Sequence, residues 1–107
     1  MDCTHLIERL EAFEERMGVR LEALFASRSE SSYLTVRGEL HPKEGTTIQQ
    51  DIELVADVYD SSGRLVAHNN EQFDAENFFG FQTFEMLISL DVPDLAISKV
   101  RLYPKPC

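Results

Sequence analysis

A chain of 107 residues suits one domain and leaves little room for a second. It carries 10 Lys and Arg against 19 Asp and Glu, and the resulting formal charge of −9 opposes binding to nucleic acid and to anionic membranes. No run of about 18 apolar residues occurs, so no membrane-spanning helix is predicted. The charge remains compatible with a basic protein surface or a cation as partner.

The two ends of the sequence bear on its cellular compartment. Residues 1–5 lack the basic head and apolar core of a secretory signal peptide, and no Asn-x-Ser/Thr acceptor occurs. We therefore expect a cytoplasmic protein, or a periplasmic or envelope protein if a signal peptide has been removed. Cys3 and Cys107 do not make a disulfide framework, and free thiols are expected. A bridge between adjacent termini is the alternative.

The first predicted element is a helix over residues 4–17. Its apolar residues recur at the spacing of one helical face: Leu6, Leu10, Phe13 and Met17. Glu14 falls on the polar face, and Gly18 follows where a helix commonly ends in the left-handed conformation. The apolar stripe is expected to pack on a sheet of the same domain. The alternative is pairing with the helix of a second copy, because a short isolated helix is marginal in water.

Residues 19–27 fit two patterns. They extend the helical stripe through Gly18, or they alternate as a strand would. A glycine inside a helix costs about 1 kcal/mol relative to alanine, which favours the strand. A turn is then expected over residues 27–32.

The remainder alternates with a period of two and predicts strands near 33–40, 48–59, 65–73, 81–90 and 97–103. Turn residues separate them, most clearly at Asp60-Ser61-Ser62-Gly63, and also at 41–45, 74–77 and 91–94. Pro104 and Pro106 are expected to end the last strand. Short alternating strands with regular turns predict an antiparallel β-sandwich over residues 33–104, mainly β in class, with one N-terminal helix.

Residues 52–66 end one strand in Tyr59-Asp60, turn through Gly63 and return as a second strand. This hairpin, with the strands at 36–40 and 84–88, resembles the FxLYD-type domains, small bacterial immunoglobulin-like β-sandwich modules. The resemblance implies a sandwich of five to seven strands and a binding or scaffold role. It implies no catalytic residues, and residues 76–80 depart from the Pro-Gly turn usual in that family.

No catalytic or metal motif is apparent. The serines cluster between residues 27 and 32 among charged neighbours, and no Gly-x-Ser-x-Gly elbow occurs. His5, His41 and His68 are far apart in sequence, unlike the paired ligands of a zinc site. We therefore predict a protein that is not an enzyme and binds no cofactor.

Five of the seven phenylalanines lie within 12 residues, at positions 73, 78, 79, 81 and 84. Adjacent Phe78 and Phe79 cannot both point inward on a regular strand, so one is expected to be exposed unless both fold under the loop. We predict that Phe73, Phe78 and Phe79 contact a protein partner, with an exposed edge strand as a further contact or a route to a homodimer.

The alternative function is binding of a small ligand or of calcium. If the two acidic turns meet at one end of the sandwich, Asp60, Asp74 and Glu76 supply oxygen ligands. The observation that would favour a ligand site is an enclosed pocket lined by Tyr59, His68 and carboxylates.

Overall fold

The computed structural model describes residues 1–29, 32–91 and 95–107. Parts of the turn predicted over 27–32 and of the break predicted over 91–94 lie outside these ranges. The elements follow in chain order: η1 (Thr4–Leu6), β1 (Ile7–Arg9), α1 (Glu11–Met17), β2 (Val19–Arg28), β3 (Tyr33–Pro42), β4 (Ile52–Asp60), β5 (Leu65–Phe73), η2 (Ala75–Asn77), β6 (Gln82–Ser89) and β7 (Ile97–Pro106).

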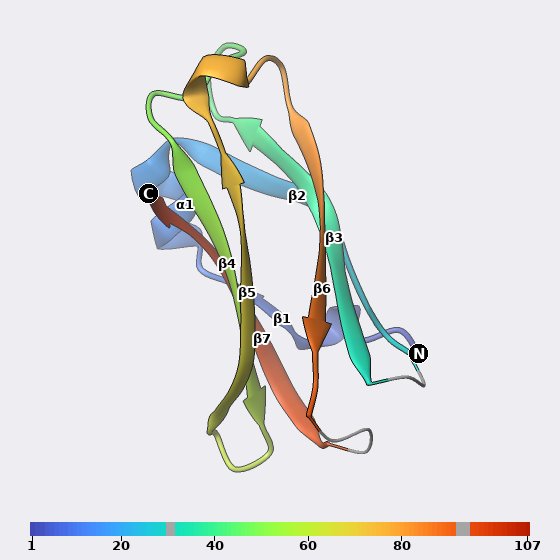
Figure 1. The fold of residues 1–107 in the computed structure, drawn as a ribbon. Coiled ribbons are helices and arrows are strands. Elements are labelled where there is room, and N and C mark those ends of the chain that lie inside the picture. The colour runs from blue at the N-terminus through green and yellow to red at the C-terminus, as the bar shows by residue number, and fades with distance from the viewer. Residues whose placement is uncertain (30–31, 92–94) are drawn as a thin grey trace.

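The strands form two sheets that face each other, and the predicted β-sandwich is confirmed (Figure 1). Among the described residues, one sheet has the order β1-β7-β4-β5 and the other β2-β3-β6. All pairings are antiparallel except β1 with β7, which is parallel. The molecule is elongated, with a longest extent of 42 Å, so its two ends are well separated.

The core lies between the sheets and follows the predicted alternation. The inward side chains of the three longest predicted faces are almost completely buried: Leu34, Val36 and Leu40; Ile52, Leu54, Ala56 and Val58; Phe84, Met86, Ile88 and Leu90. A strand alternates its side chains between two faces, so one face is buried between the sheets while the other contacts water. This periodicity in the sequence therefore located the core correctly.

The helix predicted over residues 4–17 is wrong for its first half. Residues 7–9 form β1 instead, which pairs with β7 at Val100–Leu102, and Leu10 N donates to Leu102 O at 3.3 Å. The edge of β7 offers hydrogen-bond partners that a helix cannot use, and this pairing outweighs the helical spacing. Only Glu11–Met17 is helical, and it ends at Gly18, which adopts the expected left-handed φ of +69°. The short helix packs on β7 and β2 of its own sandwich.

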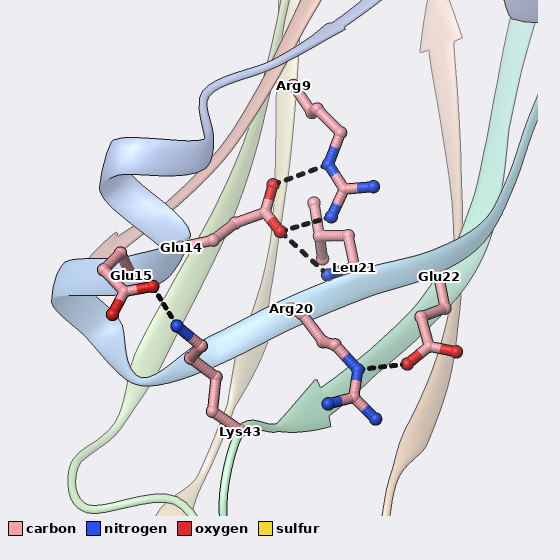
Figure 2. A network of polar contacts seen from close by, with 7 residues as sticks. All are labelled: Arg9, Glu14, Glu15, Arg20, Leu21, Glu22 and Lys43. Atoms are coloured by element: carbon pink, nitrogen blue, oxygen red, sulfur yellow. Dashed lines mark hydrogen bonds and ion pairs between the residues drawn. The ribbon is translucent and has the colours of Figure 1, made fainter.

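Glu14 was expected to face solvent, but only 4% of it is exposed. Figure 2 shows its carboxylate between Arg9 and β2. Arg9 donates through Nη2 to Glu14 Oε1 at 2.5 Å and through Nε to Oε2 at 3.0 Å, while Leu21 N donates to Oε1 at 3.0 Å. The carboxylate thus satisfies a backbone N–H on the outer edge of β2 and ties β1, α1 and β2 together.

Residues 19–27 adopt the strand favoured by the sequence, as part of β2. Three other boundaries were wrong. The 41–45 loop begins later, because β3 continues through Pro42, and β4 begins at Ile52 rather than at Ile48. Pro104 and Pro106 do not end the structure, since β7 continues through both and pairs there with β4. The three-residue β1 ends before reaching them, so a proline without an N–H is tolerated on that edge.

A bulge in β2 alters its pairing with β3. The register shifts between Glu22 and Phe25, and Ala23 takes a left-handed φ of 55°. Opposite the bulge, Gly38 leaves room for its neighbours: a Cβ there would lie 2.7 Å from Leu24 Cδ2 and 2.8 Å from Phe84 Cζ. Only glycine fits this position without displacing both side chains.

No helix among the described residues is long and apolar enough to cross a membrane.

Candidate functional site

Two loops meet at one end of the sandwich, and we call residues 43–51 and 74–81 together the aromatic end. It lies at the top of Figure 1, where η2 sits beside the loop that follows β3. Gly80 N donates to Thr46 O at 2.7 Å, and Ala75 N donates to Asp51 Oδ1 at 2.8 Å. These bonds hold the two loops against each other, so their side chains form one surface.

The phenylalanine cluster divides into core and surface. Phe73 and Phe78 are 2% and 3% exposed, and their rings meet edge to face with centroids 6.4 Å apart. Phe73 makes a similar contact with Phe84 at 6.5 Å. These rings close the core beneath the aromatic end. Of the three predicted contact residues, Phe73 and Phe78 are therefore not available at the surface.

Phe79 remains exposed: 78% of its surface is open to solvent. The 3-10 turn η2 places Phe78 under the loop, and the next residue consequently points outward. Phe81, 49% exposed, lies nearby and stacks on His41 with ring centroids 4.8 Å apart and planes inclined by 7°. His41 Nε2 lies 2.9 Å from Glu39 Oε1. The stacked pair was not predicted, because His41 lies on β3 and Phe81 in the loop before β6, and no local pattern links them.

The two loops of the aromatic end also carry carboxylates. Loops 43–51 and 74–81 contribute Glu44, Asp51, Asp74 and Glu76, and none of the ion pairs among the described residues includes them. Some of these carboxylates also affect the ionisation of the C-terminal residue, Cys107. Desolvation, followed by repulsion from Glu53, Asp51 and Asp74, raises the pKa of the Cys107 thiol. The aromatic end is therefore acidic around an exposed ring.

A cavity of about 350 Å³ adjoins the aromatic end. It lies between the last turn of α1 and loop 43–51, and its lining residues combine apolar and charged groups: Glu15, Met17, Gly18, Lys43, Glu44, Thr47, Ile48 and Gln49. Lys43 is paired with Glu15, which leaves Glu44 without an ion-pair partner among the described residues. Thr46, next to the lining residue Thr47, accepts the bond from Gly80 N that joins this loop to the one carrying Phe79.

The three carboxylates of the calcium alternative do not meet. Asp60 begins the turn between β4 and β5, whereas Asp74 and Glu76 follow β5, at the other end of the sandwich (Figure 1). Asp60 Oδ1 accepts bonds from Ser62 N and Arg64 N, both at 2.9 Å. These bonds lower the pKa of Asp60, and the bond from the Arg64 N–H has the largest effect. Its carboxylate stabilises the predicted turn, and no group of metal-ligating side chains occurs among residues 1–29, 32–91 and 95–107.

The Tyr59 and His68 side chains do not line a common pocket. Tyr59 lies between the cations of Lys99 and Arg101, 5.2 and 5.1 Å from its ring centroid. His68 is exposed opposite Asp57, which accepts a bond from Tyr103. A second cavity, of about 460 Å³, is lined by residues of β2, β3, β5 and β6, and neither cavity is lined by histidine, cysteine or serine. The two cysteines are free thiols, as expected.

Comparison with known proteins identifies no family for this chain. No family model matches the chain, and no curated protein matches it. A solved structure of a beta-glucuronidase from glycoside hydrolase family 2 aligns with 84% of this chain at 14% sequence identity and a TM-score of 0.48. The aligned region is 11% of that protein, so the chain spans only a small part of its length.

Proposed function

We propose that this chain is a non-enzymatic interaction module whose aromatic end binds a basic segment of a partner protein. The observation that carries the proposal is the exposed ring of Phe79, 78% open to solvent at the end of the sandwich whose two loops carry four carboxylates. An aromatic side chain presented to water in a loop is a frequent contact residue, and aromatic residues dominate binding energy at protein interfaces. The FxLYD-like hairpin supports the same kind of role without a catalytic site.

The charge of the aromatic end favours a basic partner. Glu44, Asp51, Asp74 and Glu76 have no ion-pair partner among the described residues, and the whole chain carries a net charge of −9. Such a field attracts cationic segments and speeds their association, and the attraction weakens as salt increases. An acidic or neutral partner would gain nothing from these carboxylates.

The cavity beside the aromatic end fits a long basic side chain. Met17 and Ile48 provide apolar surface for the methylene stem of a lysine or arginine, and Glu44 lies at the same cavity to receive the charged group. A neighbouring apolar side chain of the same segment would then cover Phe79. We therefore expect a recognition sequence that combines one apolar residue with one or more lysines or arginines.

The proposal is tested by selecting binders from a displayed library of random peptides. Enriched sequences are expected to contain Lys or Arg near an apolar residue, and a synthesised peptide should bind with an affinity that falls as salt increases. In fluorescence anisotropy, Phe79→Ser should weaken binding at least tenfold, as expected for a residue worth more than about 1.4 kcal/mol. Glu44→Gln should weaken it less and reduce its salt dependence.

Leu65→Ser is the matched control, because Leu65 is also exposed, at 56%, but lies beside the turn at the other end of the sandwich. It should leave peptide binding unchanged. Phe78 is not substituted in this test, since its buried ring supports the fold. Enriched peptides without basic residues, or equal binding by wild type and Phe79→Ser, would refute the proposal.

A further inference from the structure

The outer face of the β2-β3-β6 sheet exposes apolar side chains from all three strands. Phe25 on β2, Tyr33 on β3 and Leu87 on β6 are 38%, 43% and 56% exposed. The register places Phe25 beside Arg37 on β3, and Leu87 beside Thr35. This face points away from the other sheet of the sandwich (Figure 1).

The charged groups on this face are paired with one another. Arg37 Nε donates to Glu85 Oε2 at 2.6 Å, Arg20 pairs with Glu22, and Glu39 contacts His41. Two arginines against three glutamates leave one net negative charge here, within a chain whose total charge is −9. The face is therefore close to electrically neutral, unlike the aromatic end.

We propose that this outer face binds the same face of a second copy. Any contact between two copies that brings their acidic regions together is opposed by like-charge repulsion. Contact through the β2-β3-β6 face largely avoids this repulsion, because its charges already have partners in the same copy. Sheets pack face to face at about 10 Å with interdigitating side chains, so Phe25 and Leu87 of each copy would be covered by the other.

The shape of the face provides room for such packing. A cavity of about 460 Å³ adjoins it: four of its lining residues, Arg37, Glu39, Thr83 and Glu85, belong to this face, and the others include Glu71 of β5. An apolar side chain from the facing copy can enter it. The two other routes to a dimer are less favourable, since α1 already packs on β7 and β2, and the Asn69 side chain of β5 caps the β6 edge by donating to Leu87 O at 2.8 Å.

The size of the face predicts a weak dimer. Three strands about 4.8 Å apart and about 8 residues long, at about 3.3 Å per residue, cover roughly 400 Å² in projection. A standard stable interface buries about 800 Å² per partner. We therefore expect a reversible monomer–dimer equilibrium with a Kd on the order of 100 µM, which corresponds to a modest binding free energy.

Sedimentation equilibrium between about 10 µM and 1 mM tests the proposal, because that range brackets the expected Kd. The wild type should be monomeric at the low end and substantially dimeric at the high end. Leu87→Glu places a charge in the centre of the interface and should raise the Kd at least tenfold. Leu65→Glu is the matched control, since Leu65 is also 56% exposed but lies on the other sheet, and it should leave the Kd unchanged.

Salt gives an independent readout. Added salt screens the overall repulsion between two negative molecules, so dimerisation should be equal or tighter at higher salt, opposite to the peptide binding at the aromatic end. Circular dichroism confirms that both variants are folded. A wild type that stays monomeric at about 1 mM, or equal weakening by Leu87→Glu and Leu65→Glu, would overturn the proposal. Neither result bears on Phe79, so this proposal and the proposed function fail separately.

Discussion

Replacing Phe78 and Phe79 by alanine, one at a time, compares two adjacent residues that differ in burial. Phe78 is 3% exposed and packs on Phe73, whereas Phe79 is 78% exposed. Truncating a buried phenylalanine costs about 3–5 kcal/mol, because apolar contact is lost and a cavity remains. Truncating an exposed one changes the free energy of unfolding by less than about 0.5 kcal/mol.

These free energies convert to melting temperatures through the entropy of unfolding. At about 2.1 cal/mol/K per residue, a chain of 107 residues has an unfolding entropy near 0.2 kcal/mol/K. Phe78→Ala should therefore lower the Tm by roughly 13–22 °C, and Phe79→Ala by no more than about 2 °C. Thermal unfolding followed by circular dichroism measures both.

The comparison has a clear refuting outcome. If Phe79→Ala lowered the Tm as much as Phe78→Ala, both rings would be part of the core and the aromatic end would present no exposed contact residue. If neither variant changed the Tm by more than about 3 °C, the packing of Phe78 on Phe73 would contribute little to stability. In either case the assignment of Phe79 as the contact residue would lose its basis.

Three further predictions concern the rest of the fold. Glu14→Ala leaves the Arg9 guanidinium and a strand N–H without their acceptor. It should lower the free energy of unfolding, measured with urea, by about 2–4 kcal/mol, whereas the control Glu15→Ala should lower it by less than about 0.5 kcal/mol. Gly38→Ala introduces a Cβ 2.7 Å from a neighbouring carbon and should cost about 1–3 kcal/mol; an unchanged urea midpoint would show that the site relaxes. Burial, followed by a hydrogen bond to a carboxylate, raises the pKa of Tyr103 to about 12. The contribution of the neutral Tyr103 hydroxyl to stability should therefore persist below pH about 10 and disappear as pH rises to about 12. Ultraviolet titration should show a late-ionising tyrosine in the wild type that is lost in Tyr103→Phe.

The strands that form the core were predictable because their information is local. In residues 52–58 the apolar side chains recur at every second position, with Val55 as the one apolar residue on the other face, and every inward side chain that the pattern selects is buried. The Asp60–Gly63 turn was equally clear, since the Asp60 carboxylate binds the N–H groups of its own turn and Gly63 takes a φ of +82°. The acidic charge, which defines the character of the aromatic end, is likewise a property of composition.

Tertiary structure alone decided the features that depend on distant partners. Residues 7–9 have the spacing of a helix but join β7, because a sheet edge more than 90 residues away supplies their hydrogen bonds. Glu14 is buried because Arg9 and a strand N–H surround its carboxylate. The sequence left open whether one of Phe78 and Phe79 is exposed or both fold under the loop, and only packing on Phe73 selected Phe78 for the core. A local pattern specifies which residues share a face, whereas burial depends on what the rest of the chain places against that face.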